Sequence, residues 1–193
     1  MSTVVAPMFT FPLGDDAALL PRVVELAEAY HTLLEANCER LARWEPRINT
    51  SPTLESTRAT LERRGRAWLE GSQLPLVIAV KAADGWRLVG AVELLIDIHA
   101  RTGEVGYWID ADFEGRGLVT RAVTALLHQA FGPIGLHRVE LRTDPANERS
   151  RRLAERLGFV QEGVLREALA FPGERRDVEV YGLLAREWHG RAN

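Results

Sequence analysis

Hydrophobic residues recur at helical spacing in the first third of the chain. From Leu19 to Trp44, apolar side chains repeat every three or four positions, which predicts a helix or a broken pair of helices. Pro21 suits the first turn of that helix. Thr53 begins a second, strongly charged helix, and Gly71 is a typical helix stop. These elements form an expected N-terminal helical region over about residues 19–71.

From Leu74 the pattern changes to that of strands. The stretches Leu74–Ala82 and Trp86–Ile98 are rich in leucine, valine and isoleucine, and Asp84-Gly85 between them is a hairpin-type turn. In a third strand, Glu104–Asp110, apolar side chains occupy the odd positions and therefore share one face. The even positions, which include Glu104, belong to the other face. The pattern predicts an antiparallel meander in which Glu104 points away from the apolar face.

The remainder of the chain alternates strands and helices. Apolar residues after Leu118 make one face of a helix that Gly132-Pro133 ends, and Gly158 ends a second helix. We expect strands at 137–143, 159–170 and 177–184 and a helix at 148–157. The fold class is therefore α+β, with a mixed, mostly antiparallel sheet of about seven strands flanked by helices. We expect one domain over residues 1–193, with a core over about 74–188.

Composition narrows the classes of ligand. A net charge of -3 gives no basic surface for nucleic acid. Cys38 is the only cysteine and the five histidines are scattered, so we expect neither a disulfide nor a metal site. Residues 1–14 contain no basic segment followed by an apolar core, and no apolar run approaches the ~20 residues that span a bilayer, so we expect neither export nor a membrane span. We expect a cytoplasmic protein that does not bind membranes.

One candidate binding site is the stretch from Glu114 to Thr120, where two glycines stand between a strand and an amphipathic helix. The first N–H groups of a helix have no intrahelical partner, and Gly115 and Gly117 let an anion approach the backbone. The alternative is a purely structural turn between strand and helix, in which the glycines are needed only for their backbone dihedral angles. The stretch is neither a Rossmann fingerprint nor a P-loop, because the third glycine and the Gly-Lys-Ser/Thr ending are absent.

A second candidate is Asn147-Glu-Arg-Ser150. Asn147 is a good N-cap for the helix that follows, which explains its presence structurally. A serine inside the first turn is merely tolerated there. The Ser150 hydroxyl is therefore either a solvated surface group or a chemical one.

Together these motifs resemble the GNAT superfamily, and within it the acetyltransferases of the RimJ/RimL type that modify the N-termini of ribosomal proteins. The resemblance runs from about Leu74 to Trp188 and depends on several short motifs in the right order. They are Glu104-Val-Gly-Tyr-Trp-Ile-Asp, Gly115-Arg-Gly-Leu-Val-Thr, Asn147-x-x-Ser150, Leu157-Gly-Phe-x-x-Glu-Gly-Val-Leu-Arg166 and Tyr181-Gly-Leu-Leu.

The resemblance implies acetyl-CoA as cosubstrate and assigns roles to these residues. The pyrophosphate would bind main-chain N–H groups of the Gly loop, and the pantetheine arm would contact the third strand and the Asn of the second candidate. The residues so implied are Trp108, Ile109, Asp110, Gly115, Arg116, Gly117, Leu118, Val119, Thr120 and Asn147. The family's signature Q/R-x-x-G-x-G/A has Glu114 at its first position here and Val119 at its last.

The resemblance also supplies candidates for proton transfer. Glu104 matches a glutamate that acts as base in some members, and Glu93 on the neighbouring strand is an alternative. Ser150 matches the serine placed beside the CoA sulfur, where it would protonate the thiolate. Cys38 has apolar neighbours and no nearby histidine, which favours direct transfer over a cysteine intermediate.

The implied acceptor is a primary amine, in the first place the N-terminal amine of a ribosomal or other protein. Two alternatives stay open: a small-molecule amine or antibiotic as the acceptor, and a CoA-binding sensor without catalysis. A homodimer joined through Leu165–Phe171 is compatible with the apolar and aromatic content of that stretch.

Overall fold

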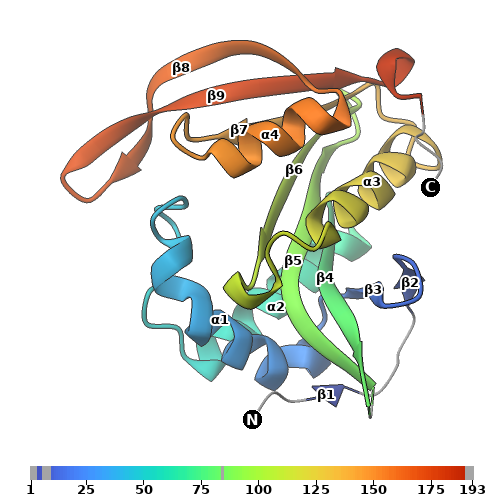
Figure 1. The fold of residues 1–193 in the computed structure, drawn as a ribbon, viewed down its shortest axis with the longest axis vertical. Coiled ribbons are helices and arrows are strands. Elements are labelled where there is room, and N and C mark those ends of the chain that lie inside the picture. Colours follow the sequence, from blue (N-terminus) through green and yellow to red (C-terminus); the bar gives the residue numbers. More distant parts are fainter. Residues whose placement is uncertain (1–3, 6–9, 84, 190–193) are drawn as a thin grey trace.

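The computed structural model describes residues 4–5, 10–83 and 85–189. Among these residues, nine strands form one sheet and four α-helices cover it (Figure 1). The helices are α1 (Ala27–Leu41), α2 (Leu54–Leu69), α3 (Leu118–Phe131) and α4 (Glu148–Leu157). The strands are β1 (Val4–Val5), β2 (Phe11–Pro12), β3 (Ala17–Pro21), β4 (Gln73–Ala82), β5 (Gly85–Asp97), β6 (Thr102–Ile109), β7 (Arg138–Thr143), β8 (Val160–Phe171) and β9 (Glu174–Leu184).

The sheet is antiparallel on both sides of one parallel contact. Its strand order is β2-β3-β4-β5-β6-β7-β9-β8, and β1 pairs with β5. Strands β2 to β6 pair antiparallel with their neighbours, as do β7, β9 and β8. The parallel contact joins β6 to β7 through the crossover helix α3. The predicted α+β class with a mixed, mostly antiparallel sheet is confirmed.

Two hydrophobic cores lie on opposite faces of the sheet. One contains Ala122 and Leu126 of α3 and Leu153 of α4, and the other contains Leu33 of α1 and Leu61 of α2. Successive strand residues point to opposite faces, so β5 contributes to both cores. Helices α3 and α4 therefore cover one face, and α1 and α2 cover the other.

The prediction of a helix from Leu19 was wrong for its first residues. Ala17–Pro21 is strand β3, paired with β4, and Pro21 is its last residue rather than the first turn of a helix. Helix α1 begins only at Ala27. The run Ala17–Leu20 is buried throughout, so it has no alternation to distinguish a central strand from a buried helix. The sheet has more strands than the seven expected because this strand and the two-residue β1 and β2 were not predicted.

The other predicted boundaries agree closely with the structure. Thr53 caps α2 in a reciprocal capping box with Ser56, and Gly71 and Gly158 follow α2 and α4 with φ of 72° and 87°. The turn residue Asp84 lies outside the described residues. No helix in the described part of the chain is long and apolar enough to cross a membrane.

Candidate active site

Strands β6 and β7 pair only at their beginnings and then diverge. Pairing covers Thr102, Gly103 and Glu104 of β6, whereas β6 continues to Ile109 and β7 to Thr143 on their other neighbours. Asp110 N donates to the Val89 carbonyl at 2.7 Å, so the backbone at even positions of β6 faces β5.

The backbone groups at odd positions of β6 therefore face β7 beyond its last pairing. They belong to Val105, Tyr107 and Ile109, and the Ile109 carbonyl accepts from the Arg40 guanidinium. An extended ligand could pair with this edge as an added strand. Of the predicted residues Trp108, Ile109 and Asp110, only Ile109 directs its main chain toward this edge, because the main chains of Trp108 and Asp110 face β5.

Glu104 is the last β6 residue paired with β7, at the point of divergence. Its side chain lies on the sheet face opposite the α3 core and is 41% exposed. Burial raises the pKa of Glu104 above its usual range, and the Arg142 guanidinium, with Nε 3.5 Å from Oε2, acts in the opposite direction. The result is a partly exposed carboxylate whose proton affinity is higher than that of a free glutamate.

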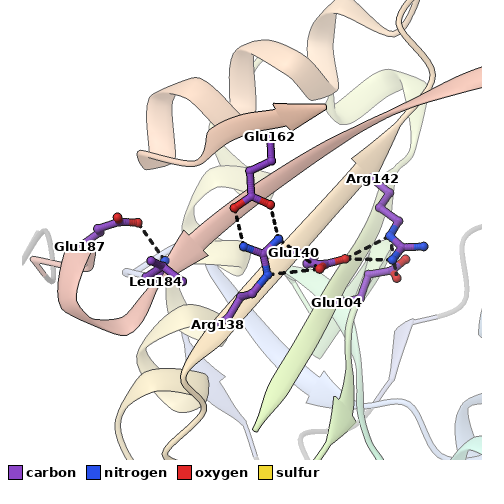
Figure 2. A network of polar contacts seen from close by, with 7 residues as sticks. All are labelled: Glu104, Arg138, Glu140, Arg142, Glu162, Leu184 and Glu187. Carbon is purple, nitrogen blue, oxygen red and sulfur yellow. Dashed lines mark hydrogen bonds and ion pairs between the residues drawn. The ribbon is translucent and has the colours of Figure 1, made fainter. Parts of the chain in front are cut away.

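Arg142 belongs to a chain of ion pairs that links β6, β7 and β8 (Figure 2). Glu140 accepts from Arg142 at 3.0 Å and from Arg138 at 3.1 Å, and Arg138 also binds Glu162 of β8. Glu104 is at the end of this chain. Its contact with Arg142 is an ion pair without a hydrogen bond.

Glu93 lies on the same face as Glu104, one strand away, with different surroundings. Its Oε2 accepts from Arg22 and Arg64, and from Gln73 Nε2 at 2.8 Å. The Arg22 side chain is 4% exposed and also donates to Tyr30 Oη at 3.1 Å. The Glu93 carboxylate is thus the counter-ion of a buried arginine.

Ser150 lies in the first turn of α4, on the face opposite to Glu104. Its Oγ is 2.5 Å from Tyr107 Oη, a contact that joins α4 to β6 where the strands diverge. Burial raises the pKa of Tyr107 to about 12, so its phenol stays protonated. Asn147 caps α4 by accepting from Ser150 N at 3.2 Å. The sequence motifs contained Tyr107 but gave it no role, because its contact is with a residue 43 positions away.

The loop before α3 presents unpaired backbone donors. Gly115 and Gly117 have φ of 72° and 73°, and both are exposed. Among the described residues, the backbone N–H groups of 115–120 have no protein acceptor, and Arg121 is the first residue of α3 to donate within the helix. These donors and the positive end of the helix dipole are a suitable environment for an anion.

Most side chains of this loop are engaged away from those donors. Leu118 is buried, and Val119 packs against the same core. Arg116 donates to the Asp112 carbonyl at 2.7 Å, with its guanidinium 4.5 Å from the centre of the Phe113 ring. Thr120 Oγ1 accepts from Arg156 of α4 at 3.4 Å. An anion at this loop would therefore contact mainly main-chain N–H groups.

Two cavities of about 370 and 510 Å³ lie beside α1, away from Glu104 and Ser150. The first is bounded by α1, β5 and residues 110–112, and the second by α1 and residues 50–53. Neither has Glu104, Ser150 or the Gly loop in its lining. No group of three or more histidine, cysteine or acidic side chains in the described part of the chain is arranged to hold a metal ion.

Comparison with known proteins identifies the family. Residues 19–160 match the family model described as "Acetyltransferase (GNAT) domain". The chain is 34% identical over 187 residues to the putative ribosomal N-acetyltransferase YdaF of Bacillus subtilis, covering 95% of this chain and 99% of that protein.

Solved structures agree with this match. Mycobacterium smegmatis RimJ in complex with CoA-disulfide is 27% identical, with a TM-score of 0.81 over 90% of this chain and 84% of that one. The microcin C7 self-immunity acetyltransferase MccE, in complex with acetyl-CoA and AMP, is 26% identical, with a TM-score of 0.79 over 89% and 94% of the two chains.

Proposed function

The chain belongs to the GNAT acetyltransferase family, and we propose that it moves the acetyl group of acetyl-CoA to the N-terminal amine of a protein or peptide. Glu104 is the proposed base and Ser150 the proposed acid. The observation that carries the proposal is their placement on opposite faces of the sheet at the point where β6 and β7 diverge.

The unpaired backbone groups support acetyl-CoA as the cosubstrate. The N–H groups of residues 115–120 suit a pyrophosphate, and the open β6 edge suits the amide groups of a pantetheine arm. The RimJ and MccE structures contain CoA-disulfide and acetyl-CoA. With the pyrophosphate at the loop and the pantetheine along β6, the thioester would lie near the point of divergence.

The surroundings of the two glutamates favour Glu104 over Glu93 as the base. Glu93 accepts hydrogen bonds from two arginines and a glutamine, so its carboxylate is already occupied. Glu104 has one arginine at 3.5 Å and a pKa raised by burial, so it is better suited to take a proton.

Ser150 is the proposed donor to the departing thiolate. Glu104 takes a proton from the ammonium group, and the resulting amine nitrogen bonds to the acetyl carbon as the carbon–sulfur bond breaks. The Ser150 hydroxyl gives its proton to the departing sulfur and is reprotonated, through water, by the second proton that the nitrogen loses, while Glu104 releases its proton to solvent. Tyr107 stays protonated and can donate to Ser150 Oγ, which directs the serine proton away from Tyr107.

Direct transfer is also supported by the position of Cys38. This thiol is buried in α1, and its Sγ lies 3.4 Å from the carbonyl oxygens of Glu35 and Thr50. Neither of these partners lies on β6 or β7. A covalent acetyl-cysteine route therefore has no nucleophile at the proposed site.

The names of the relatives support a protein acceptor, since YdaF is described as a putative ribosomal N-acetyltransferase. The test is a thiol-release assay with acetyl-CoA and three classes of acceptor: N-terminal peptides of ribosomal proteins, free lysine and small amines. We expect turnover with the peptides. Turnover with small amines alone would indicate a small-molecule acceptor instead of a protein. Acetyl-CoA binding without turnover on any amine would indicate a sensor.

A further inference from the structure

Glu114 places a carboxylate directly beside the proposed phosphate site. It precedes the loop whose N–H groups are unpaired, so its charge would repel a pyrophosphate. Both of its oxygens are occupied, however: Oε1 accepts from Arg40 at 3.1 Å and Oε2 accepts from Arg149. The charge of Glu114 is therefore compensated by one arginine from α1 and one from α4.

The two arginines are held to different degrees. Arg40 also donates to Asn37 Oδ1 at 2.8 Å and to the Ile109 carbonyl, and its side chain is 31% exposed. Arg149 is 78% exposed, and Glu114 is its one polar side-chain partner among the described residues. Arg40 is fixed in place by its additional contacts, whereas Arg149 is free to exchange its partner.

Helix α4 brings a second cation to the same loop. Arg149 and Arg156 are seven positions apart and so lie on one face of the helix, and Arg156 reaches Thr120 in the first turn of α3. Arg116, within the loop, is folded back on Asp112 and Phe113. The arginines that reach the loop from outside it on this side therefore come from α4.

We propose that Arg149 exchanges Glu114 for a phosphate of acetyl-CoA. Glu114 is then an internal counter-ion that holds the first turn of α4 to the loop and competes with the cosubstrate for Arg149. A phosphate oxygen accepts the same charge-assisted hydrogen bonds from a guanidinium as a carboxylate does. Glu114 keeps Arg40 after the exchange. The inference depends on the proposed function, because it takes acetyl-CoA as the ligand.

The exchange implies a preference for thioesters that carry phosphate. An acyl donor without phosphate has no group that replaces Glu114 on Arg149 and leaves that ion pair in place. The pyrophosphate and the 3′-phosphate of CoA share the required chemistry, and acetyl-dephospho-CoA, which lacks the 3′-phosphate, distinguishes them.

The test is a double-mutant cycle on acetyl-CoA affinity, measured by titration calorimetry with wild type, Glu114→Gln, Arg149→Gln and the double variant. Removing the competing carboxylate should tighten binding by about 2- to 5-fold, which is the range for one exposed ion pair. Arg149→Gln should weaken binding by about 3- to 10-fold. In the Arg149→Gln background, Glu114→Gln should change the dissociation constant by less than about twofold, because the competition is gone.

Two variants control for net charge. Glu155→Gln removes a charge from an exposed position of α4, and Arg63→Gln removes one from α2 on the other face of the sheet. Both should leave the affinity within about twofold of wild type. Melting temperatures confirm that each variant is folded.

Equal tightening by Glu114→Gln with and without Arg149 would mean simple repulsion and would overturn the exchange. So would wild-type affinity in Arg149→Gln for both acetyl-CoA and acetyl-dephospho-CoA. An Arg149→Gln penalty with acetyl-CoA alone identifies the 3′-phosphate, and an equal penalty with both identifies the pyrophosphate. A wild-type protein that binds no acetyl-CoA would instead refute the proposed function.

Discussion

Glu104 and Glu93 are one strand apart on the same face of the sheet, and their neighbours give them different tasks. Glu93 neutralises Arg22, which is almost completely buried, whereas Glu104 lies where β6 and β7 diverge, with one arginine at 3.5 Å. Because both side chains are glutamates, the same substitution at each position can distinguish a loss of catalysis from a loss of stability.

Replacing Glu104 by Gln should lower kcat by about 100- to 10,000-fold, the usual worth of one general base. Stability should not fall. Burial raises the pKa of Glu104 above its unfolded value of about 4.5, so the ionised carboxylate costs the folded state stability above that raised pKa, and the cost is absent below about pH 4.5. Thermal unfolding at neutral pH should therefore occur at the same or a slightly higher temperature than in wild type.

The matched variant is Glu93→Gln. It weakens the counter-ion of Arg22, and we expect it to destabilise the fold by up to about 3 kcal/mol in a denaturant titration. At a temperature where it is folded, it should retain most of the wild-type kcat. The reverse pattern, with Glu93→Gln inactive and Glu104→Gln active, would exchange the two assignments.

Arg142 should tune the proton affinity of Glu104. Its positive charge lowers the pKa of Glu104 against the effect of burial, so Arg142→Gln should raise that pKa. Because the base must be deprotonated, the acidic limb of kcat/KM against pH should move to higher pH. Arg138→Gln removes another arginine of the same network that does not contact Glu104, and it should leave the limb where it is. Equal shifts in both variants would contradict a specific role for Arg142.

Tyr107 and Ser150 should act as one unit. Ser150→Ala should lower kcat with little change in acetyl-CoA affinity, because the proposed proton transfer occurs only as the thiolate leaves. Tyr107→Phe should lower kcat by up to about 10-fold, the worth of one hydrogen bond of about 0.5–1.5 kcal/mol. In the Ser150→Ala background, Tyr107→Phe should have no further effect. Additive losses in single-turnover experiments would mean that Tyr107 acts independently of the serine.

Residue partners were the least predictable part of the site. Glu114 was identified from the sequence as the acidic residue beside the loop, but Arg40, its fixed partner, is 74 positions away and gives no local signal. The same holds for Arg22 and Arg64 around Glu93. Sequence patterns show which face of an element a residue occupies, whereas ion pairs between elements depend on the tertiary fold.

At the scale of elements, the loop before α3 and the beginning of α4 were predictable because their signals are local. Glycine in the left-handed region and an Asn N-cap depend on near neighbours in the chain. Strand β3 was not predictable in the same way. Its run of buried residues has no periodicity, and only its pairing with β4 makes it a strand.

Gly117→Val tests the loop as a binding element. We expect loss of acetyl-CoA binding in calorimetry, because a side chain on Gly117 restricts the approach of phosphate and strains a residue with φ of 73°. Gly71→Val is the matched control: φ is 72°, an added Cβ also meets no atom within 4 Å, and the residue follows α2.

Both variants should lose similar stability from backbone strain, about 1–2 kcal/mol. Only Gly117→Val should lose affinity. Normal acetyl-CoA affinity in folded Gly117→Val would make the loop a structural turn only, and equal loss of affinity in both would point to a general effect of instability.

At the scale of the whole molecule, the sheet would separate the two halves of the proposed reaction. Its one parallel contact is short, so β6 and β7 diverge beyond Glu104, between the face covered by α3 and α4 and the face covered by α1 and α2. In the proposed mechanism, the thiolate and Ser150 lie on the first face and the amine and Glu104 on the second. The acceptor would therefore approach from the side of α1 and α2.

The most direct measurement of the central claim is tandem mass spectrometry on a peptide that contains both a free N-terminal amine and a lysine. Wild-type protein and acetyl-CoA should add one acetyl group, located on the N-terminal nitrogen, with one CoA thiol released per peptide. Glu104→Gln should reduce both products together. Acetyl groups on the lysine alone, or an unmodified peptide despite acetyl-CoA binding, would contradict the account.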